Sequence, residues 1–146
     1  MREIKFRGKR IDNHKWVHGY YFEGFTGIPY ILVLHDHILG MTEFYEVDPD
    51  TVGQYTGLKD KNGKEIYEGD IVRMHFFFEN YHPVTLGVFE DEEEIVCKLS
   101  ITPLGVYFES DNMTGYLCDH LQEPSEELEV IGNIHDNPDL LKGTEP

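Results

Sequence analysis

The sequence predicts a mainly β fold, in one domain that covers residues 1–146. Three observations lead to this prediction. The chain contains nine Tyr, nine Phe and one Trp, and aromatic side chains favour strands over helices. Several short segments alternate polar and apolar residues, which is the pattern of a strand with one buried face. A length of 146 residues is sufficient for one hydrophobic core but short for two.

Turn chemistry and strand alternation agree most closely in residues 51–74. In the Asp-Lys-Asn-Gly tetrad at residues 60–63, the aspartate can fix the first corner of a hairpin loop. The glycine can take the positive φ that such a loop needs. A second turn at residues 68–70 leads into another strand at residues 71–74. We therefore expect this stretch to supply central strands.

Residues 3–22 are predicted to form a long N-terminal β-hairpin. The first strand alternates charged and apolar side chains, and the second strand follows a turn at residues 12–15. Trp16 comes directly after this turn, where its ring can pack on the core or present a flat face to a partner. Packing is the favoured interpretation.

Further segments are predicted as strands or as short helices. Asp48 can cap one or two helical turns that have Pro49 at the first position. Residues 137–143 have the same kind of start and end on a glycine, so they predict a short C-terminal helix. The remaining predicted strands cover residues 30–34, 43–47, 84–89, 95–99, 105–109 and 128–134.

Two unusual runs lie in the middle of the chain. Residues 75–83 form a dense aromatic run, which we expect to begin as a strand and to end as a loop at Pro83. If exposed, this run is a surface for a partner, with Phe77 and Tyr81 as candidate contacts. Residues 90–94 are five consecutive acids, which repel one another and indicate a solvated turn.

The charge of the chain is unevenly distributed. The formal net charge is −16, and residues 65–146 carry all of it with 19 acids and three bases. Residues 1–15, by contrast, hold six bases and two acids. This asymmetry predicts repulsion from phosphate over most of the surface, with the basic N-terminal hairpin as the exception. The candidate binding residues of that hairpin are Arg7, Lys9, Arg10, Lys15 and Trp16.

The sequence predicts a cytoplasmic protein without a membrane partner. No segment reaches the roughly 18 apolar residues of a membrane span, and the N-terminus lacks the apolar run of a signal peptide. In the cytoplasm the thiols of Cys97 and Cys118 are expected to stay reduced.

No motif in the chain predicts catalysis. None of the three serines lies in a nucleophile elbow, and the chain has neither a glycine-rich phosphate loop nor a His-Glu-x-x-His motif. The most metal-like cluster is His35 with His37, for which Cys118 or His120 would have to supply a third ligand. Because this spacing matches no known framework, we predict loop residues here, without a metal or a cofactor.

Several blocks of sequence resemble a known family. In chain order they read IKFRGKR at residues 4–10, WVHG at 16–19, TVGQYTGL at 51–58, DKNG at 60–63, IYEGDIV at 66–72, IGNI at 131–134, NP at 137–138 and LL at 140–141. Together they resemble the YopX family of phage and prophage proteins. The resemblance implies a small, β-rich pseudo-barrel encoded by bacteriophages or by prophages of mostly Gram-positive bacteria. It implies no known activity and transfers no catalytic residue.

The resemblance is confined to parts of the domain. Family-like blocks fall in residues 1–74 and 128–142, whereas residues 76–123 match no block, so we expect functional differences between members there. The first turn also departs from the family, because residues 12–16 read Asp-Asn-His-Lys-Trp where Asn-Gly is more usual before the tryptophan. We expect this hairpin to bend differently.

The leading functional hypothesis is a non-enzymatic phage or prophage accessory protein in the cytoplasm of a bacterial host. It would act as a protein-interaction module that binds a host or phage protein. Two alternatives stay open: the clustered acids mimic DNA and occupy a host DNA-binding protein, or the basic N-terminal hairpin binds nucleic acid. We also expect a homo-oligomer, because the basic residues 1–15 of one copy complement the acidic half of another.

Overall fold

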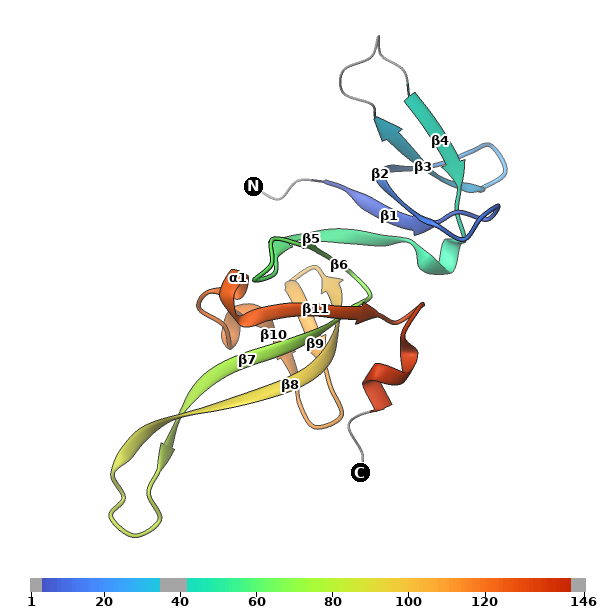
Figure 1. Cartoon of the computed structure of the whole chain (residues 1–146). Helices are drawn as coiled ribbons and strands as arrows, with labels where there is room; N and C mark the ends of the chain where they lie inside the picture. Colours follow the sequence, from blue (N-terminus) through green and yellow to red (C-terminus); the bar gives the residue numbers. More distant parts are fainter. Residues whose placement is uncertain (1–3, 35–41, 143–146) are drawn as a thin grey trace. The chain divides into compact units, whose positions relative to one another are not determined.

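A computed structural model describes residues 4–34 and 42–142, and it confirms the mainly β fold class. The strands form antiparallel sheets, and the helical segments between them are short (Figure 1). These sheets do not close into a barrel among the described strands. The chain divides into two compact units, Met1–Gly57 and Leu58–Pro146. That the chain forms one domain stays a prediction.

The first unit is built on one antiparallel sheet, in the order β4-β3-β2-β1-β5. Strand β5 continues into the second unit, which contains its last two residues. The strands are β1 (Phe6–Lys9), β2 (Trp16–Glu23), β3 (Pro29–Leu34), β4 (Thr42–Glu46) and β5 (Gly53–Lys59), and the 3₁₀ turn η1 (Pro49–Thr51) lies between β4 and β5.

The second unit contains a five-stranded antiparallel sheet in the order β10-β9-β8-β7-β11. The strands of this sheet are β7 (Asp70–Tyr81), β8 (Val88–Thr102), β9 (Gly105–Glu109), β10 (Thr114–Tyr116) and β11 (Leu128–Asn133). The unit also contains β6 (Glu65–Tyr67), which pairs next to β5 in the other sheet. Its helical segments are η2 (Leu117–Asp119), α1 (Pro124–Glu127) and η3 (Pro138–Lys142).

The predicted N-terminal hairpin is confirmed as β1 paired with β2. Its turn is tight, because His14 takes a left-handed conformation with a φ of 60°, where glycine is the usual residue. The side chain of Asn13 supports the turn, since its Oδ1 accepts the main-chain N–H of Lys15 at 3.0 Å. His14 therefore takes the left-handed position that the glycine of an Asn-Gly step would occupy.

The two turns of the central stretch are confirmed. Asp60 fixes the first corner, because its Oδ1 accepts the main-chain N–H groups of Asn62 and Lys64, both at 2.9 Å. Gly63 has a φ of 80° and Gly69 a φ of 92°, so both occupy the left-handed region that favours glycine. These turns carry the chain from β5 through β6 into β7.

The core of the second unit lies on one face of its sheet. Its fully buried members include Ile66, Val72, Met74, Cys97, Phe108 and Leu128. Cys97 and Cys118 are both free thiols, the first buried and the second exposed. Burial raises the pKa of the Cys97 thiol to about 12, so this thiol stays protonated near neutral pH.

Two predictions in the middle of the chain are wrong. The five acids at residues 90–94 lie inside strand β8, and the turn instead covers residues 83–85. The predicted strand at residues 84–89 is therefore limited to its last two residues, Val88 and Phe89. The aromatic run remains a strand through Tyr81, because β7 pairs with β8 without interruption from Ile71–Lys98 to Tyr81–Val88.

The predicted helical turns are present in shorter form. The side chain of Asp48 accepts the N–H of Asp50 and caps η1, with Pro49 in the first turn. The C-terminal segment η3 is a 3₁₀ helix that starts at Pro138. None of the helices in the described part of the chain has the length and apolarity needed to cross a bilayer.

Candidate interaction surface on the hairpin arm

The main candidate site is the outer part of the β7–β8 hairpin, residues 75–94, which we call the hairpin arm. Pairing of β11 with β7 ends at Met74, and pairing of β9 with β8 ends at Lys98. Beyond these points, among the described strands, β7 and β8 pair only with each other. The arm is therefore a two-stranded ribbon that extends past the rest of the second sheet (Figure 1).

Both faces of the arm mix aromatic and acidic side chains. Directly paired residues of an antiparallel ladder share a face. One face carries the pairs His75–Glu94, Phe77–Glu92, Glu79–Glu90 and Tyr81–Val88. The other face carries Phe76–Glu93, Phe78–Asp91 and Asn80–Phe89. Neither face is uniformly apolar, so the alternation of a half-buried strand is absent here.

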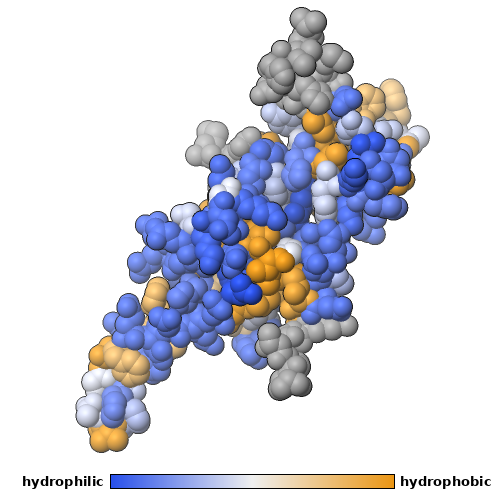
Figure 2. Space-filling model, in the orientation of Figure 1, coloured by the Kyte–Doolittle hydropathy of each residue, from blue (hydrophilic) through white to orange (hydrophobic). Residues whose placement is uncertain are grey.

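Apolar side chains of the arm are strongly exposed. Phe76 is buried and anchors the arm to the core, but beyond it exposure rises towards the tip. The exposed fractions are 49% for Phe77, 37% for Phe78, 62% for Tyr81, 82% for Val84, 72% for Leu86, 55% for Val88 and 44% for Phe89. Figure 2 shows hydrophobic colour interleaved with hydrophilic colour along this hairpin.

The charge of the arm has one sign. Residues 75–94 contain six acids and no Lys or Arg. His75 lies 3.2 Å from a carboxylate oxygen of Glu92, and its ring is 5.0 Å from that of Phe77. The arm therefore combines exposed apolar surface with a negative potential, and this combination favours a basic ligand over a phosphate.

The tip of the arm is closed by a strained turn. The N–H of Leu86 donates to the carbonyl oxygen of His82 at 2.9 Å, and Leu86 itself has a φ of 59°. The His82 Nδ1 accepts the N–H groups of Val84 and Thr85, each at 3.2 Å. A bulky residue in the left-handed region is uncommon and costs on the order of 1–3 kcal/mol.

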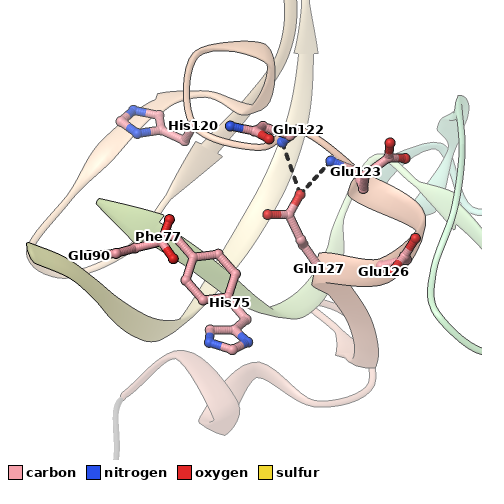
Figure 3. A pocket seen from close by; sticks show the side chains of 8 residues that line it. All are labelled: His75, Phe77, Glu90, His120, Gln122, Glu123, Glu126 and Glu127. Atoms are coloured by element: carbon pink, nitrogen blue, oxygen red, sulfur yellow. Dashed lines mark hydrogen bonds between the residues drawn. The ribbon is translucent and has the colours of Figure 1, made fainter. Parts of the chain in front are cut away.

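A pocket of about 400 Å³ lies at the base of the arm (Figure 3). His75 and Phe77 of β7 form part of its wall, and His120 lies across from them. Glu127 has a structural role here, because its Oε1 accepts the N–H groups of Gln122 and Glu123 at 3.0 and 2.6 Å. The other residues that line the pocket are Glu90 and Glu126. The lining supplies carboxylates and imidazoles but no hydroxyl or thiol nucleophile.

The predicted basic residues fall into two groups. Lys9 pairs directly with Trp16, and the Arg7 guanidinium lies 4.6 Å from the centre of the Trp16 ring. Arg10 lies elsewhere: its guanidinium is 3.9 Å from the ring centre of Tyr45 and forms an ion pair with Asp12 at 2.6 Å. This ion pair lowers the pKa of Asp12. Much of the basic charge is thus held in contacts within the unit.

The remaining predicted site residues stand apart. Lys15 is exposed in the first turn, while Phe77 and Tyr81 share one face of the arm. Their roles in binding stay predictions.

The predicted histidine cluster is only partly visible. His35 and His37 lie outside the described residues. Across residues 4–34 and 42–142, no group of three or more His, Cys, Asp or Glu side chains has the geometry of a metal site. The His120 ring makes edge contacts with Phe76 and Phe108 at 6.1 and 5.3 Å, so it packs beside the core.

Sequence reasoning missed five exposed residues of the arm, Phe78, Val84, Leu86, Val88 and Phe89. A usable signal was present, because residues 75–81 and 88–94 have equal length and flank a short segment with Pro83 and Gly87. Two runs of equal length around a turn segment are typical of a hairpin.

A comparison with protein families agrees with the sequence resemblance. A family model described as YopX protein matches residues 5–142 of this chain. No curated protein matches the chain. Among solved structures, the crystal structure of protein EF1440 from Enterococcus faecalis is similar, with 22% sequence identity and a TM-score of 0.49. This match covers 97% of the present chain and 99% of the other chain.

Proposed function

The chain belongs to the YopX family, and from this premise we propose that it is a non-enzymatic phage or prophage accessory protein that works as a protein-interaction module. Its binding element is the hairpin arm. It acts in the cytoplasm of a bacterial host, on a host or phage protein. The exposed apolar surface of the arm is the observation that carries this proposal.

An arm of this kind is poorly stabilised by itself. An isolated two-stranded ribbon is marginal in water, because it lacks the third strand or the helix that usually buries one face. Here the large side chains of Phe77 and Tyr81 remain 49% and 62% exposed. A partner that covers them removes apolar surface from water and stabilises the ribbon at the same time.

Leu86 supports the same proposal. At a φ of 59°, glycine or asparagine would avoid most of the backbone strain, yet the tip carries a leucine that is 72% exposed. In the free protein this side chain packs against little. A strained and exposed leucine is understandable if the leucine makes its contacts in a complex.

The charge of the arm defines the chemistry of the partner. Six acids without Lys or Arg require a basic surface, and the aromatic residues require apolar pockets within it. Two arms repel one another, and duplex DNA repels the arm. Residues 75–81 and 88–94 also present strand edges, to which a strand of the partner can add.

Site-specific photo-cross-linking in bacterial cells tests this proposal. A photoreactive amino acid replaces Phe77, which is 49% exposed, in one variant and Leu104, which is 78% exposed in the β8–β9 turn, in the control. We expect a defined protein with a basic surface to be cross-linked at Phe77 and not at Leu104. Nuclease treatment before irradiation should leave the product unchanged.

Two results would contradict the proposal. Identical products from Phe77 and Leu104 would mean that the arm has no specific partner. Displacement of the captured protein by added duplex DNA would favour DNA mimicry by the acidic residues instead.

A second candidate partner is another copy of the chain. The observation behind it is the charge asymmetry, because residues 1–15 carry four net positive charges and residues 65–146 carry sixteen net negative charges. A heterologous contact between these segments closes into a ring when its rotation permits. Light scattering tests it: an oligomer that dissociates as salt is raised supports the contact. A 17 kDa monomer at every concentration and salt level would exclude it.

A further inference from the structure

We propose that the first unit carries a binding face for single-stranded nucleic acid, separate from the hairpin arm. In antiparallel strands, paired residues point to one face and neighbouring residues alternate between faces. The registers of β2, β3 and β4 therefore place five aromatic residues on a common face, which we call the aromatic face. These residues are Trp16, Tyr20, Phe22, Tyr30 and Phe44.

Three rings of the aromatic face contact one another, and three of its five residues are exposed to solvent. Phe22 and Tyr30 are stacked, with ring centres 5.2 Å apart and planes 17° apart. Phe44 meets both rings edge-on, at 5.9 and 5.6 Å. The exposed fractions are 49% for Tyr20, 38% for Phe22 and 59% for Phe44. Such a platform can stack unpaired bases of any sequence, since every base has a π-face.

Positive charge adjoins this face. Pairing of β1 with β2 places Lys9 on the same face as Trp16, with the Lys9 amino group 5.7 Å from the centre of the Trp16 ring. Arg7 shares this face but is only 7% exposed, so it is too buried to meet a phosphate group. Lys15 is exposed in the turn that precedes Trp16. Lys9 and Lys15 lie at the β1–β2 end of the aromatic face, where a phosphate backbone that leaves the stacked rings meets them.

The acids of these strands lie mainly on the opposite face. Glu23 accepts a hydrogen bond from the hydroxyl of Tyr21, and Glu43 accepts one from the hydroxyl of Tyr45. The strand registers place all four side chains on the face opposite the aromatic face. Among the described residues of strands β1 to β4, Glu46 is the acid that shares the aromatic face. This separation of charge favours a phosphate-containing ligand over an apolar protein surface.

The distribution of charge between the units agrees with this assignment. Residues 1–57 hold eight acids and six Lys or Arg, whereas residues 58–146 hold 20 acids and six Lys or Arg. The first unit therefore repels phosphate far less. We expect weak binding that does not depend on sequence, with a Kd on the order of 1–100 µM near physiological salt.

Fluorescence anisotropy with labelled oligonucleotides of 20 thymidines or 20 uridines tests the proposal on the full chain. We expect at least one of these two oligonucleotides to bind. The oligonucleotide with the lower Kd identifies DNA or RNA as the natural ligand. A duplex should bind at least tenfold more weakly, because its bases are already stacked. Phe44→Ala should weaken binding about 5- to 150-fold, as expected for the loss of one stacked base.

Three further variants separate this face from the arm and from the fold. Lys9→Gln should weaken binding, and Tyr81→Ala in the arm should leave oligonucleotide binding unchanged. Glu43→Gln, on the opposite face, is the matched surface control and should also have no effect. Circular dichroism verifies that each variant is folded.

The proposal would be overturned by several results. One is the absence of any anisotropy change at 100 µM protein and low salt. Others are equal binding of duplex and single strands, or unchanged binding by folded Phe44→Ala. If oligonucleotides do not bind and Phe44→Ala abolishes an oligomer seen by light scattering, the aromatic face is a contact between copies of the chain. The cross-linking result at Phe77 is independent of all these outcomes.

Discussion

The carboxylate of Asp60 accepts the main-chain N–H of Val130 at 2.9 Å, although the two residues are 70 positions apart. The same carboxylate organises its own turn through Asn62 and Lys64. Asp60 thus connects the β5–β6 turn to strand β11, and it is only 3% exposed. One side chain therefore joins a local turn to the long-range pairing of the second unit.

Replacing Asp60 should destabilise the protein. In Asp60→Asn the amide nitrogen faces a main-chain N–H, so at least one buried donor loses its acceptor, at a cost of about 1–3 kcal/mol. Urea unfolding measures this cost. Asp111→Asn, at an exposed turn position, is the matched control and should change the free energy of unfolding by less than about 0.5 kcal/mol. Equal effects of the two substitutions would contradict the assignment.

The contribution of Asp60 should depend on pH. Burial opposes ionisation of this carboxyl, but the N–H groups of Val130, Lys64 and Asn62 outweigh burial and hold its pKa below the usual value. A depressed pKa in the folded state adds stability above the unfolded pKa of about 3.9, and this stability is lost as pH falls through the folded pKa. The difference in unfolding free energy between wild type and Asp60→Asn should therefore shrink below about pH 4. A difference in unfolding free energy that stays constant from pH 6 to pH 2 would contradict the depressed pKa of Asp60.

Valine at either left-handed glycine should destabilise the central stretch. Gly63 and Gly69 have φ values of 80° and 92°, where a β-branched side chain is strained, so Gly63→Val and Gly69→Val should each cost roughly 1–3 kcal/mol. Gly87 has no left-handed φ and lies in open surroundings, so Gly87→Val serves as the control. Thermal unfolding that ranks Gly87→Val with the other two would refute the strain argument.

Leu86→Gly should stabilise the hairpin arm and weaken binding of its partner. Glycine relieves the left-handed strain, for a gain of about 0.5–1 kcal/mol, but removes an exposed apolar contact. Hydrogen exchange of amides in residues 75–94 measures local stability. In the control, Val84→Gly removes a similarly exposed side chain at an ordinary φ, so exchange should become faster instead of slower. Faster exchange in both variants would remove the evidence for strain.

The accuracy of the sequence predictions follows from how local each interaction is. The turn at residues 60–63 was predictable because its aspartate and glycine act within four residues. The strain at Leu86 was not, because leucine is not among the residue types that usually adopt a positive φ. Pairing of Lys9 with Trp16 follows directly once the hairpin register is known.

The hairpin arm was mispredicted for a different reason. Acidic residues 90–94 are usually solvated, and the prediction assumed that solvation means a turn. A two-stranded ribbon exposes both faces, so consecutive acids can point alternately to solvent while their backbone stays paired with residues 75–79. The alternation of polar and apolar residues detects strands that bury one face, but it does not detect strands that bury neither face.

The most direct test of the central claim uses the partner protein that is captured by cross-linking at Phe77. After purification, the affinity of this partner is measured by titration for the wild type and for the double variant Phe77→Ser/Tyr81→Ser. Both serines lie on one face of the arm, and Leu104→Ser in the exposed β8–β9 turn is the control. If the arm is the binding element, the double variant should bind at least about 30-fold more weakly, as expected for the loss of a binding hot spot. Leu104→Ser should bind like wild type. Equal affinities of the wild type and a folded double variant would contradict the assignment of the arm as the binding element.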